Sequence, residues 1–267
     1  MPVATAVVFN KRREVINADA PHFAKPPRDP DIDCCRRRND CDWRARRRRP
    51  LADHPVRIIV PYPAGGSTDV LTRILAERFK DIFGQPFVIE NRAGAGGNIG
   101  IAALTGSSPD GYTIGAATIG HFAINQYLYN KMPYDPEYDM IPASLTWELP
   151  NVFVVPADHV PAKTLSEFLV WTKQKGRVSY GSPGVGTSPH LSGVMFVKQS
   201  GIDGIHVPFR GAAQTIPAML AGDVNFAIDN LASYVPVIQS GNARTRRHVG
   251  AALADFAGYS HHGRGRN

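Results

Sequence analysis

Glycine-rich loops that lead from apolar runs into polar helix starts are the segments of this chain best suited to chemistry. The stretch "PYPAGGSTDV" at residues 61–70 follows the apolar run "VRIIV" and ends in Ser, Thr and Asp, which commonly begin helices. Such a loop presents free backbone N–H groups at the positive end of a helix dipole, which attracts carboxylate or phosphate. A tight strand-to-helix turn that binds nothing is the alternative for this stretch taken alone.

Three further stretches repeat the pattern: "ENRAGAGGNIG" at 90–100, "YGSPGVGTSPHLSG" at 180–193 and "PFRGAAQTIPAML" at 208–220. Each follows a strand-like run, and Asp229 and Asn230 end another such run. Ligands of open parallel sheets bind beyond the C-terminal ends of the strands. Four glycine loops at one sheet edge therefore predict an anion site built from backbone N–H groups, which needs no charged side chain.

Alternating strand and helix patterns position these loops from Pro55 onward. We expect strands at 56–60, 87–90, 112–117, 151–155, 178–181, 205–209 and 224–228. We expect helices at 68–82, 97–105, 121–129, 164–175, 188–199, 212–221 and 231–239. This alternation predicts an α/β fold with mainly parallel sheets and flanking helices. Residues 130–148, rich in proline and polar residues, are expected to pass between two lobes.

Motifs typical of enzymes are missing from the sequence. It has no G-x-S-x-G elbow, no P-loop and no H-E-x-x-H pair, and Ile99 stands where a dinucleotide fingerprint needs its third glycine. The three cysteines, Cys34, Cys35 and Cys41, lack matching histidine spacing for zinc. We expect no catalytic residue, metal or cofactor. The alternative is a soluble α/β enzyme that acts on a small carboxylate through Asp69 and His190.

Positive charge is concentrated at the ends of the chain. The formal net charge is +7, yet residues 55–240 contain 12 Lys/Arg and 14 Asp/Glu, and eight arginines lie between positions 36 and 49. An arginine-rich arm that binds nucleic acid is one interpretation. We favour a disordered basic segment over residues 1–54 and expect no nucleic-acid partner, because the neighbouring fold offers no basic surface to extend the arm. The sequence contains no run of 18 apolar residues, so it predicts no membrane-spanning helix.

Several of these stretches, in this order, resemble the substrate-binding proteins of the tripartite tricarboxylate transporter family, also called the Bug family. The resemblance covers about residues 55–241. It is carried by "PVRIIVPYPAGGSTDVLTRILAE", "FVIENRAGAGGNIG", "PDGYTIG", "YGSPGVGTSPHLSG" and "HVPFRGAAQTIPAMLAGDVNFAIDN". It implies a two-lobed, type II-like periplasmic binding protein that holds a small carboxylate between its lobes and serves membrane transporter subunits. It also implies a periplasmic location, and we expect a monomer.

The resemblance places the ligand in a cleft formed by loops of both lobes, residues 55–148 and 149–241. Backbone amides, hydroxyls and waters would hold the ligand, and lobe closure would exclude solvent. The implied binding residues of the first lobe are Tyr62, Pro63, Ala64, Gly65, Gly66, Ser67, Asp69, Thr118 and His121. Those of the second lobe are Ser182, Gly186, Thr187, Ser188, His190, Phe209, Arg210, Gly211 and Asp229.

Both ends of the chain depart from the family pattern. Residues 1–54 supply no secretory signal peptide, so the chain as written would stay in the cytoplasm. The resemblance stops at Gly241, and the tail 242–267 lacks the expected strand and helices. When the tail is translated back into a DNA sequence with allowed codons and that DNA is read one base later, it encodes a continuation that resembles the family. We therefore expect a frameshift product, an incomplete first lobe and a defective receptor.

Overall fold

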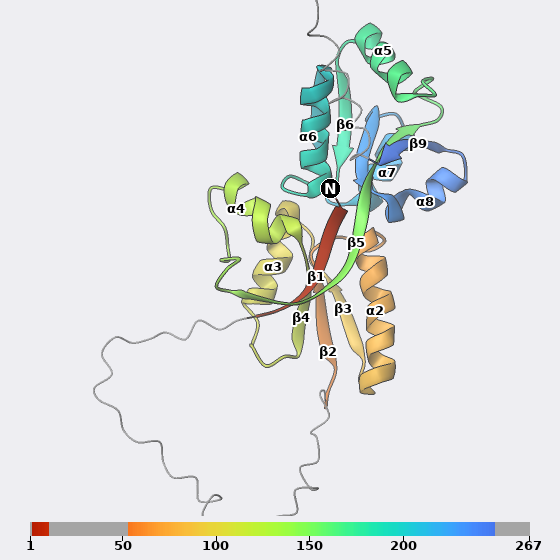
Figure 1. Cartoon of the computed structure of the whole chain (residues 1–267). Helices are drawn as coiled ribbons and strands as arrows, with labels where there is room; N and C mark the ends of the chain where they lie inside the picture. The colour runs from red at the N-terminus through yellow and green to blue at the C-terminus, as the bar shows by residue number, and fades with distance from the viewer. Residues whose placement is uncertain (1, 11–52, 249–267) are drawn as a thin grey trace, which may run out of the picture.

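A nine-stranded mixed sheet forms the framework of the protein (Figure 1). The computed structural model describes residues 2–10 and 53–248. The strands are β1 (Pro2–Asn10), β2 (Val56–Val60), β3 (Phe87–Asn91), β4 (Thr113–Thr118), β5 (Met140–Pro156), β6 (Val178–Ser182), β7 (Gly204–Pro208), β8 (Phe226–Asn230) and β9 (Ala243–His248). Their order is β3-β2-β4-β1-β5-β8-β6-β7, and β9 also pairs with β5.

Helices follow most of the strands. They are α2 (Ser67–Phe83), α3 (Asn98–Thr105), α4 (Asn125–Leu128), α5 (Leu165–Lys175), α6 (Ser188–Ser200), α7 (Ala212–Leu220) and α8 (Leu231–Gln239). A 3-10 turn, η2 (Ala95–Gly97), precedes α3, and a π-helical turn, η3 (Gly120–Ile124), precedes α4. These bounds agree with the ranges predicted for seven helices and for the short strands to within a few residues.

The sheet divides into two lobes that share one long strand. In the first lobe β2 lies parallel between β3 and β4, and in the second β6 lies parallel between β7 and β8. The pairings of β1, β5 and β9 are all antiparallel. The expected parallel pairing is thus found within each lobe, and the central strands add antiparallel pairs. Among the described residues, β5 alone runs through both lobes, so residues 140–156 form one strand of 17 residues.

Alternate side chains of β2 explain how helices cover both faces of the first lobe. Ile59 packs with Ile101 and Leu104 of α3, whereas Ile58 packs in a separate cluster with Ala76 of α2. Successive residues of a strand point to opposite faces, so this apolar run is buried on both sides. Figure 1 shows α2 and α3 on either side of these strands.

Aromatic residues fill the core of the second lobe. The ring of Phe153, on the buried end of β5, has its centroid 5.0 Å from those of Phe168, Phe196 and Phe226. These four side chains come from β5, α5, α6 and β8, and each is at most 1% exposed. Burial of such rings is the main source of stability for a domain of this size. The far half of β5 is therefore fixed in the second lobe.

Two strands form where the sequence predicted none. Residues 2–10, expected to be part of a disordered segment, form β1 between β4 and β5. Register shifts after Thr5 and Val7 interrupt the pairing, so the buried side chains Thr5 and Val8 do not alternate and the strand has no readable period. Residues 243–248 of the tail form β9 against β5. The arginine-rich segment 36–49 and the tail beyond 248 lie outside the described residues.

A wide apolar hollow of about 730 Å³ opens beside α2 in the first lobe. Among its lining side chains are Val7, Phe9, Phe79 and Trp147 from β1, α2 and β5. Apolar surface of this extent is normally covered in a stable domain. The hollow agrees with the expectation of an incomplete first lobe.

Candidate ligand-binding cleft

Four helices begin around one small cavity between the lobes. The cavity has a volume of about 40 Å³ and lies at the starts of α2, α6, α7 and α8. Predicted residues that line it are Tyr62, Pro63, Gly66, Ser67, Thr118, Thr187, Ser188, Gly211 and Asp229. The other lining residues are Thr68, Pro183, Pro189, Ala212, Asn230 and Ser233. Half of the predicted site residues thus lie at one place, as the resemblance implied.

Three of these four helices begin without a side-chain cap. Gly66 precedes α2, Gly211 precedes α7 and Asn230 precedes α8, and none of their side chains accepts a bond from the first turn. Only α6 is capped, by the Thr187 hydroxyl, which accepts from the His190 N–H at 3.4 Å. The first N–H groups of a helix have no partner within it, and the dipole there favours negative charge. The cavity is therefore suited to a carboxylate.

Polar atoms without partners gather at the same place. Ser188 Oγ, Asp229 Oδ2 and Asn230 Oδ1 line or border the cavity, and each is buried with no hydrogen-bond partner among the described residues. The hydroxyl of Tyr234, in the first half of α8, is also buried without a hydrogen-bond partner among the described residues. Buried polar groups in folded proteins nearly always have a partner. These atoms are therefore positioned to bond a ligand or water molecules.

Asp229 is the ionisable group of the cavity wall. It is 1% exposed at the end of β8, and its Oδ1 accepts from the Asn230 N–H at 2.7 Å. Burial raises the pKa of Asp229 to about 7, and the Asn230 N–H offsets only part of that effect. Its neighbours Tyr62 and Tyr234 stay neutral, because burial raises the pKa of Tyr62 to about 12 and raises that of Tyr234 well above its usual value. Near neutral pH a protonated Asp229 can donate a hydrogen bond to an anion.

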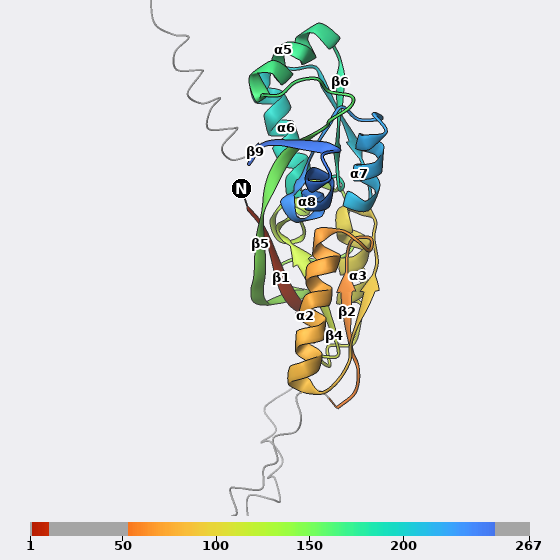
Figure 2. The ribbon, with the colours of Figure 1, turned by 90° about the vertical axis from the view of Figure 1, so that its right-hand side faces the viewer.

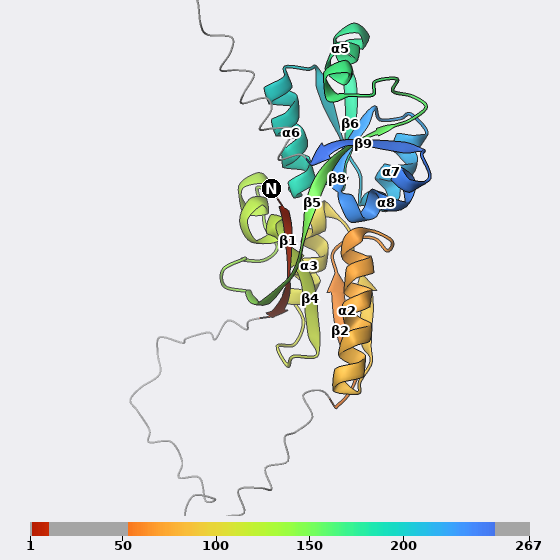
Figure 3. The same ribbon diagram turned by 45° about the vertical axis from the view of Figure 1, so that its right-hand side comes forward.

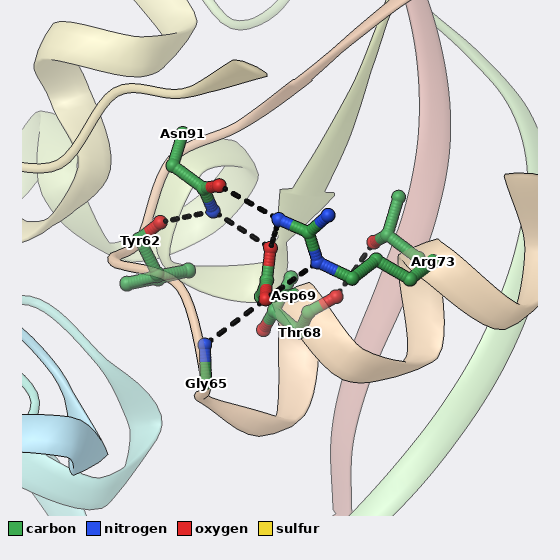
Figure 4. A network of polar contacts seen from close by, with 7 residues as sticks. Tyr62, Gly65, Thr68, Asp69, Arg73 and Asn91 are labelled. Atoms are coloured by element: carbon green, nitrogen blue, oxygen red, sulfur yellow. Dashed lines mark hydrogen bonds and ion pairs between the residues drawn. The ribbon is translucent and has the colours of Figure 1, made fainter. Parts of the chain in front are cut away.

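Asp69, in contrast, is turned away from the cavity and fully bonded (Figure 4). Its carboxylate accepts from Arg73 through two bonds of 3.0 Å, from the Gly65 N–H at 3.0 Å and from Asn91 at 2.8 Å. Burial opposes ionisation, but these hydrogen bonds prevail and hold the pKa of Asp69 below its usual value. Asp69 therefore fixes the loop 61–66 to α2 and β3 and is not free to contact a ligand.

His121 supports the wall from behind. Its Nδ1 accepts from the Thr118 N–H at 3.0 Å, and the Thr118 hydroxyl lies 3.2 Å from the Tyr62 hydroxyl in the cavity. Burial lowers the pKa of His121 to about 4, so the ring is neutral. Gly97 packs against this ring so closely that a Cβ would lie 2.2 Å from Nε2. The resemblance implied that His121 is a binding residue, but its ring does not line the cavity.

Comparison with known proteins agrees with this architecture. Residues 71–252 match the family described as tripartite tricarboxylate transporter family receptor.

This chain belongs to that family.

Among curated relatives, BugT of Bordetella pertussis is 34% identical to this chain over 192 residues, which cover 71% of this chain and 59% of BugT. A protein of Pseudomonas sp. strain P51 is 33% identical over 191 residues, or 71% of this chain and 56% of that one. The chain thus spans less than three fifths of the length of these two relatives.

Solved structures with the same fold include two with a bound carboxylate. A Rhodopseudomonas palustris protein with adipate superposes with a TM-score of 0.71 at 32% identity, and MatC of the same organism with malate at 0.67 and 28%. Both alignments cover 73% of this chain and 66% of the other chain. A periplasmic transporter gives a TM-score of 0.71 at 37% identity over the same fractions.

Several predicted second-lobe residues lie behind the cavity. Ser182 is buried and its hydroxyl lies 2.7 Å from His206 Nε2, while the ring centroid of His190 lies 4.4 Å from that of His206 with the two rings tilted. Burial lowers the pKa of both histidines, that of His206 to about 4. Phe209 is half-buried against the second-lobe core. These side chains support the loop 183–189 and do not line the cavity.

The remaining predicted residues point to solvent or to the other lobe. Ala64, Gly65 and Arg210 are exposed outside the cavity. The backbone N–H of Arg210 donates to the side-chain oxygen Oε1 of Gln214 at 3.1 Å. Gly186 has φ +87° and packs against Asn125 of the first lobe, where a Cβ would lie 2.0 Å from Oδ1. Arg210 in particular does not supply a positive charge to the cavity.

The alternative enzymatic pair does not form. Asp69 lies on α2 in the first lobe with all its acceptor capacity used, and His190 lies on α6 in the second lobe against His206. These two residues therefore do not face each other as a base and an acid. In residues 2–10 and 53–248 no three His, Cys, Asp or Glu side chains meet as a metal-binding group. Within the same ranges, no helix combines the length and apolarity needed to cross a bilayer.

Asn230 and Ser233 are two of the six cavity residues that were not among the predicted site residues. The junction from β8 to α8 contains no glycine, so it lacks the loop signal that marked the other three helix starts. Both residues bond across the cleft to Ser67, whose N–H donates to Ser233 Oγ at 3.0 Å. Asp229 and Asn230 were recognised as a strand end, which was the available signal for this corner.

Proposed function

We propose that this chain captures a small mono- or dicarboxylate between its lobes as the solute-binding component of a tripartite tricarboxylate transporter. The observation that carries the proposal is the convergence of three uncapped helix starts and several unpartnered polar atoms on one cavity. A bound carboxylate can accept hydrogen bonds from the N–H groups of the helix starts and from the hydroxyl groups at the same time, so it supplies partners for both.

The described residues that line the cavity include no lysine or arginine, which favours a carboxylate over a phosphate as the ligand. A phosphate with two charges gains most from paired cations, whereas a carboxylate is held well by backbone N–H groups and hydroxyls. Relatives of the same fold carry adipate and malate, which are dicarboxylates. We propose that Ser67, Thr118, Thr187 and Ser188 supply hydroxyl contacts and that Asp229 donates its proton to the bound anion.

Membrane subunits of the transporter would take the ligand from the receptor in the periplasm, and the receptor would act as a monomer without chemical change of the ligand. Family membership supports the link to a tripartite transporter, and the periplasmic relative supports the location.

A thermal-shift screen followed by titration calorimetry tests the proposal. The purified chain is mixed with malate, succinate, adipate, citrate, inorganic phosphate, neutral sugars and amines of similar size. We expect the melting temperature to rise with a mono- or dicarboxylate, and the rise to vanish in Ser188→Ala/Asp229→Ala. Stabilisation by sugars or amines alone would overturn the proposal, as would turnover of the bound carboxylate seen by mass spectrometry.

A further inference from the structure

The strands β1 and β9 lie end to end along β5. His248, the last residue of β9, pairs with Val152, and Pro2, the first residue of β1, pairs with Pro150. Only Asn151 separates these two positions of β5. Both strands run antiparallel to β5, so they point the same way along it. Figures 2 and 3 show the tip of β9 directed at the start of β1.

β1 also holds the first lobe together. It pairs with β4 from Thr5 to Phe9 and with β5 from Pro2 to Asn10, and β4 and β5 do not pair with each other. Without β1, the parallel strands β2, β3 and β4 would lose their hydrogen-bonded connection to the strand that crosses between lobes. Two open edges would then face each other, and an open edge is a template for another strand.

Side chains of β1 belong to the core on both faces. Val8 is fully buried in the cluster with Ile59 and Ala117, and Val7 and Phe9 pack in the cluster with Ile58. Thr5 is 1% exposed, and its carbonyl accepts from the Thr146 hydroxyl at 2.8 Å. The space between β4 and β5 therefore selects an extended segment with a small or β-branched side chain at each buried position.

We propose that this space is a strand-acceptor site, which residues 2–10 fill from the beginning of the chain in the place of a strand that runs on from β9. The site takes an extended peptide antiparallel to β5, joined to the second lobe either through β9 or, as here, separately. The register carries this inference, because a strand leaving His248 would reach the position of Pro2 after one residue. In this chain β9 and β1 thus lie along β5 as a second strand path between the lobes, which is interrupted between His248 and Pro2.

Cysteine cross-links in the full chain test the occupant. The pairs Ala6→Cys/Ala117→Cys and Val7→Cys/Ala116→Cys follow the register, and Ala6→Cys/Ala116→Cys is displaced by one residue. In all three, Cys34, Cys35 and Cys41 are changed to Ser. We expect an intramolecular disulfide in at least one in-register pair, because adjacent antiparallel pairs alternate in geometry, and little in the displaced pair. Disulfide-linked dimers, or equal yields in all three, would overturn filling of the site by the same chain.

Relocating the strand tests its continuity with β9. In one variant residues 2–10 become a Gly/Ser sequence and residues 250–258 become "PVATAVVFN", which restores the pairing positions after one intervening residue. The matched control carries "PVATAVDFN" at 250–258, with aspartate in the place of the buried Val8. We expect the relocated strand to restore the native melting temperature to within about 3 °C and the control to melt at least 8 °C lower. Equal melting of relocated and control chains would overturn continuity with β9.

Discussion

Asn230 Nδ2 donates a hydrogen bond of 3.1 Å to Ser67 Oγ and so joins the start of α8 in the second lobe to the start of α2 in the first. The Ser67 N–H donates in turn to Ser233 Oγ at 3.0 Å. Outside the cavity lining, the Tyr129 hydroxyl of the first lobe donates to the Val185 carbonyl of the second at 3.1 Å. The lobes are thus in contact at two places, which is the arrangement expected when a ligand is enclosed.

Removal of the Asn230 amide should favour the open arrangement of the lobes. A net hydrogen bond contributes about 0.5–1.5 kcal/mol, so we expect Asn230→Ala to weaken carboxylate binding about two- to tenfold. Calorimetric titration measures this, and small-angle scattering should report a larger radius of gyration. Ser240→Ala, at the other end of α8, is the control and should change neither. Unchanged affinity in Asn230→Ala would refute the role of this contact in closure.

Gly120 is a second determinant of closure. A Cβ at this position would lie 2.8 Å from the Gly186 carbonyl oxygen of the other lobe, and backbone atoms cannot easily yield. We expect Gly120→Ala to weaken ligand binding by about tenfold or more while the melting temperature of the unliganded chain falls little. Gly106→Ala, whose Cβ meets Ala102 of its own helix at 3.2 Å, is the control. A large loss of stability without loss of affinity would contradict this assignment.

Binding should weaken as Asp229 loses its proton. Its pKa of about 7 means that the carboxyl is neutral in mildly acidic solution and charged in alkaline solution. A charged Asp229 repels an anionic ligand, so we expect affinity to fall between pH 6 and about pH 8. Asp229→Asn should bind with little pH dependence across this range, which titration at three pH values would measure. Tyr62 and Tyr234 do not titrate in this range, because their pKa values are raised.

The buried carboxyl of Asp229 should also make the unliganded chain more stable in mildly acidic than in alkaline solution. The folded-state pKa of Asp229 is raised above the unfolded value of 3.8, so folding is progressively disfavoured as pH rises from about 4 through 7. Asp229→Asn should therefore melt above the native chain at pH 8 and close to it at pH 4. The difference is at most about 4 kcal/mol, since each pKa unit corresponds to about 1.4 kcal/mol. A lower melting temperature for the variant at pH 8 would contradict this.

Asp69 should contribute to the free energy of unfolding and not to direct contact with a ligand. Asp69→Asn weakens the bonds to Arg73 and Gly65, and we expect a loss of about 1–3 kcal/mol in the free energy of unfolding at pH 7. Because its folded-state pKa is lowered, this stabilisation is present above the unfolded value of 3.8 and is lost as pH falls through the folded value. Chemical denaturation at pH 7 and pH 3 measures both. The exposed Asp81→Asn is the control and should have little effect.

The sequence alone determined most of the elements and the general place of the site. Buried parallel strands are continuous apolar runs and helices repeat every 3.6 residues, so β2 and α2 are readable from local order. The glycine loops before α2 and α7 likewise mark helix starts without side-chain caps, because glycine permits the turn and offers no side chain to fill it. Local chemistry therefore predicted helix starts that the fold brings to the cavity.

Tertiary structure decided which side chains face the cavity and how the lobes are connected. Asp69 and Ser67 are two residues apart on the same helix start, but only pairing with Arg73 and Asn91 turns Asp69 away, and that pairing depends on β3. β1 has no readable period because register shifts break it, and it is a strand only because β4 and β5 leave a space between them. Pairings between distant segments follow from the packed fold, and no local pattern encodes them.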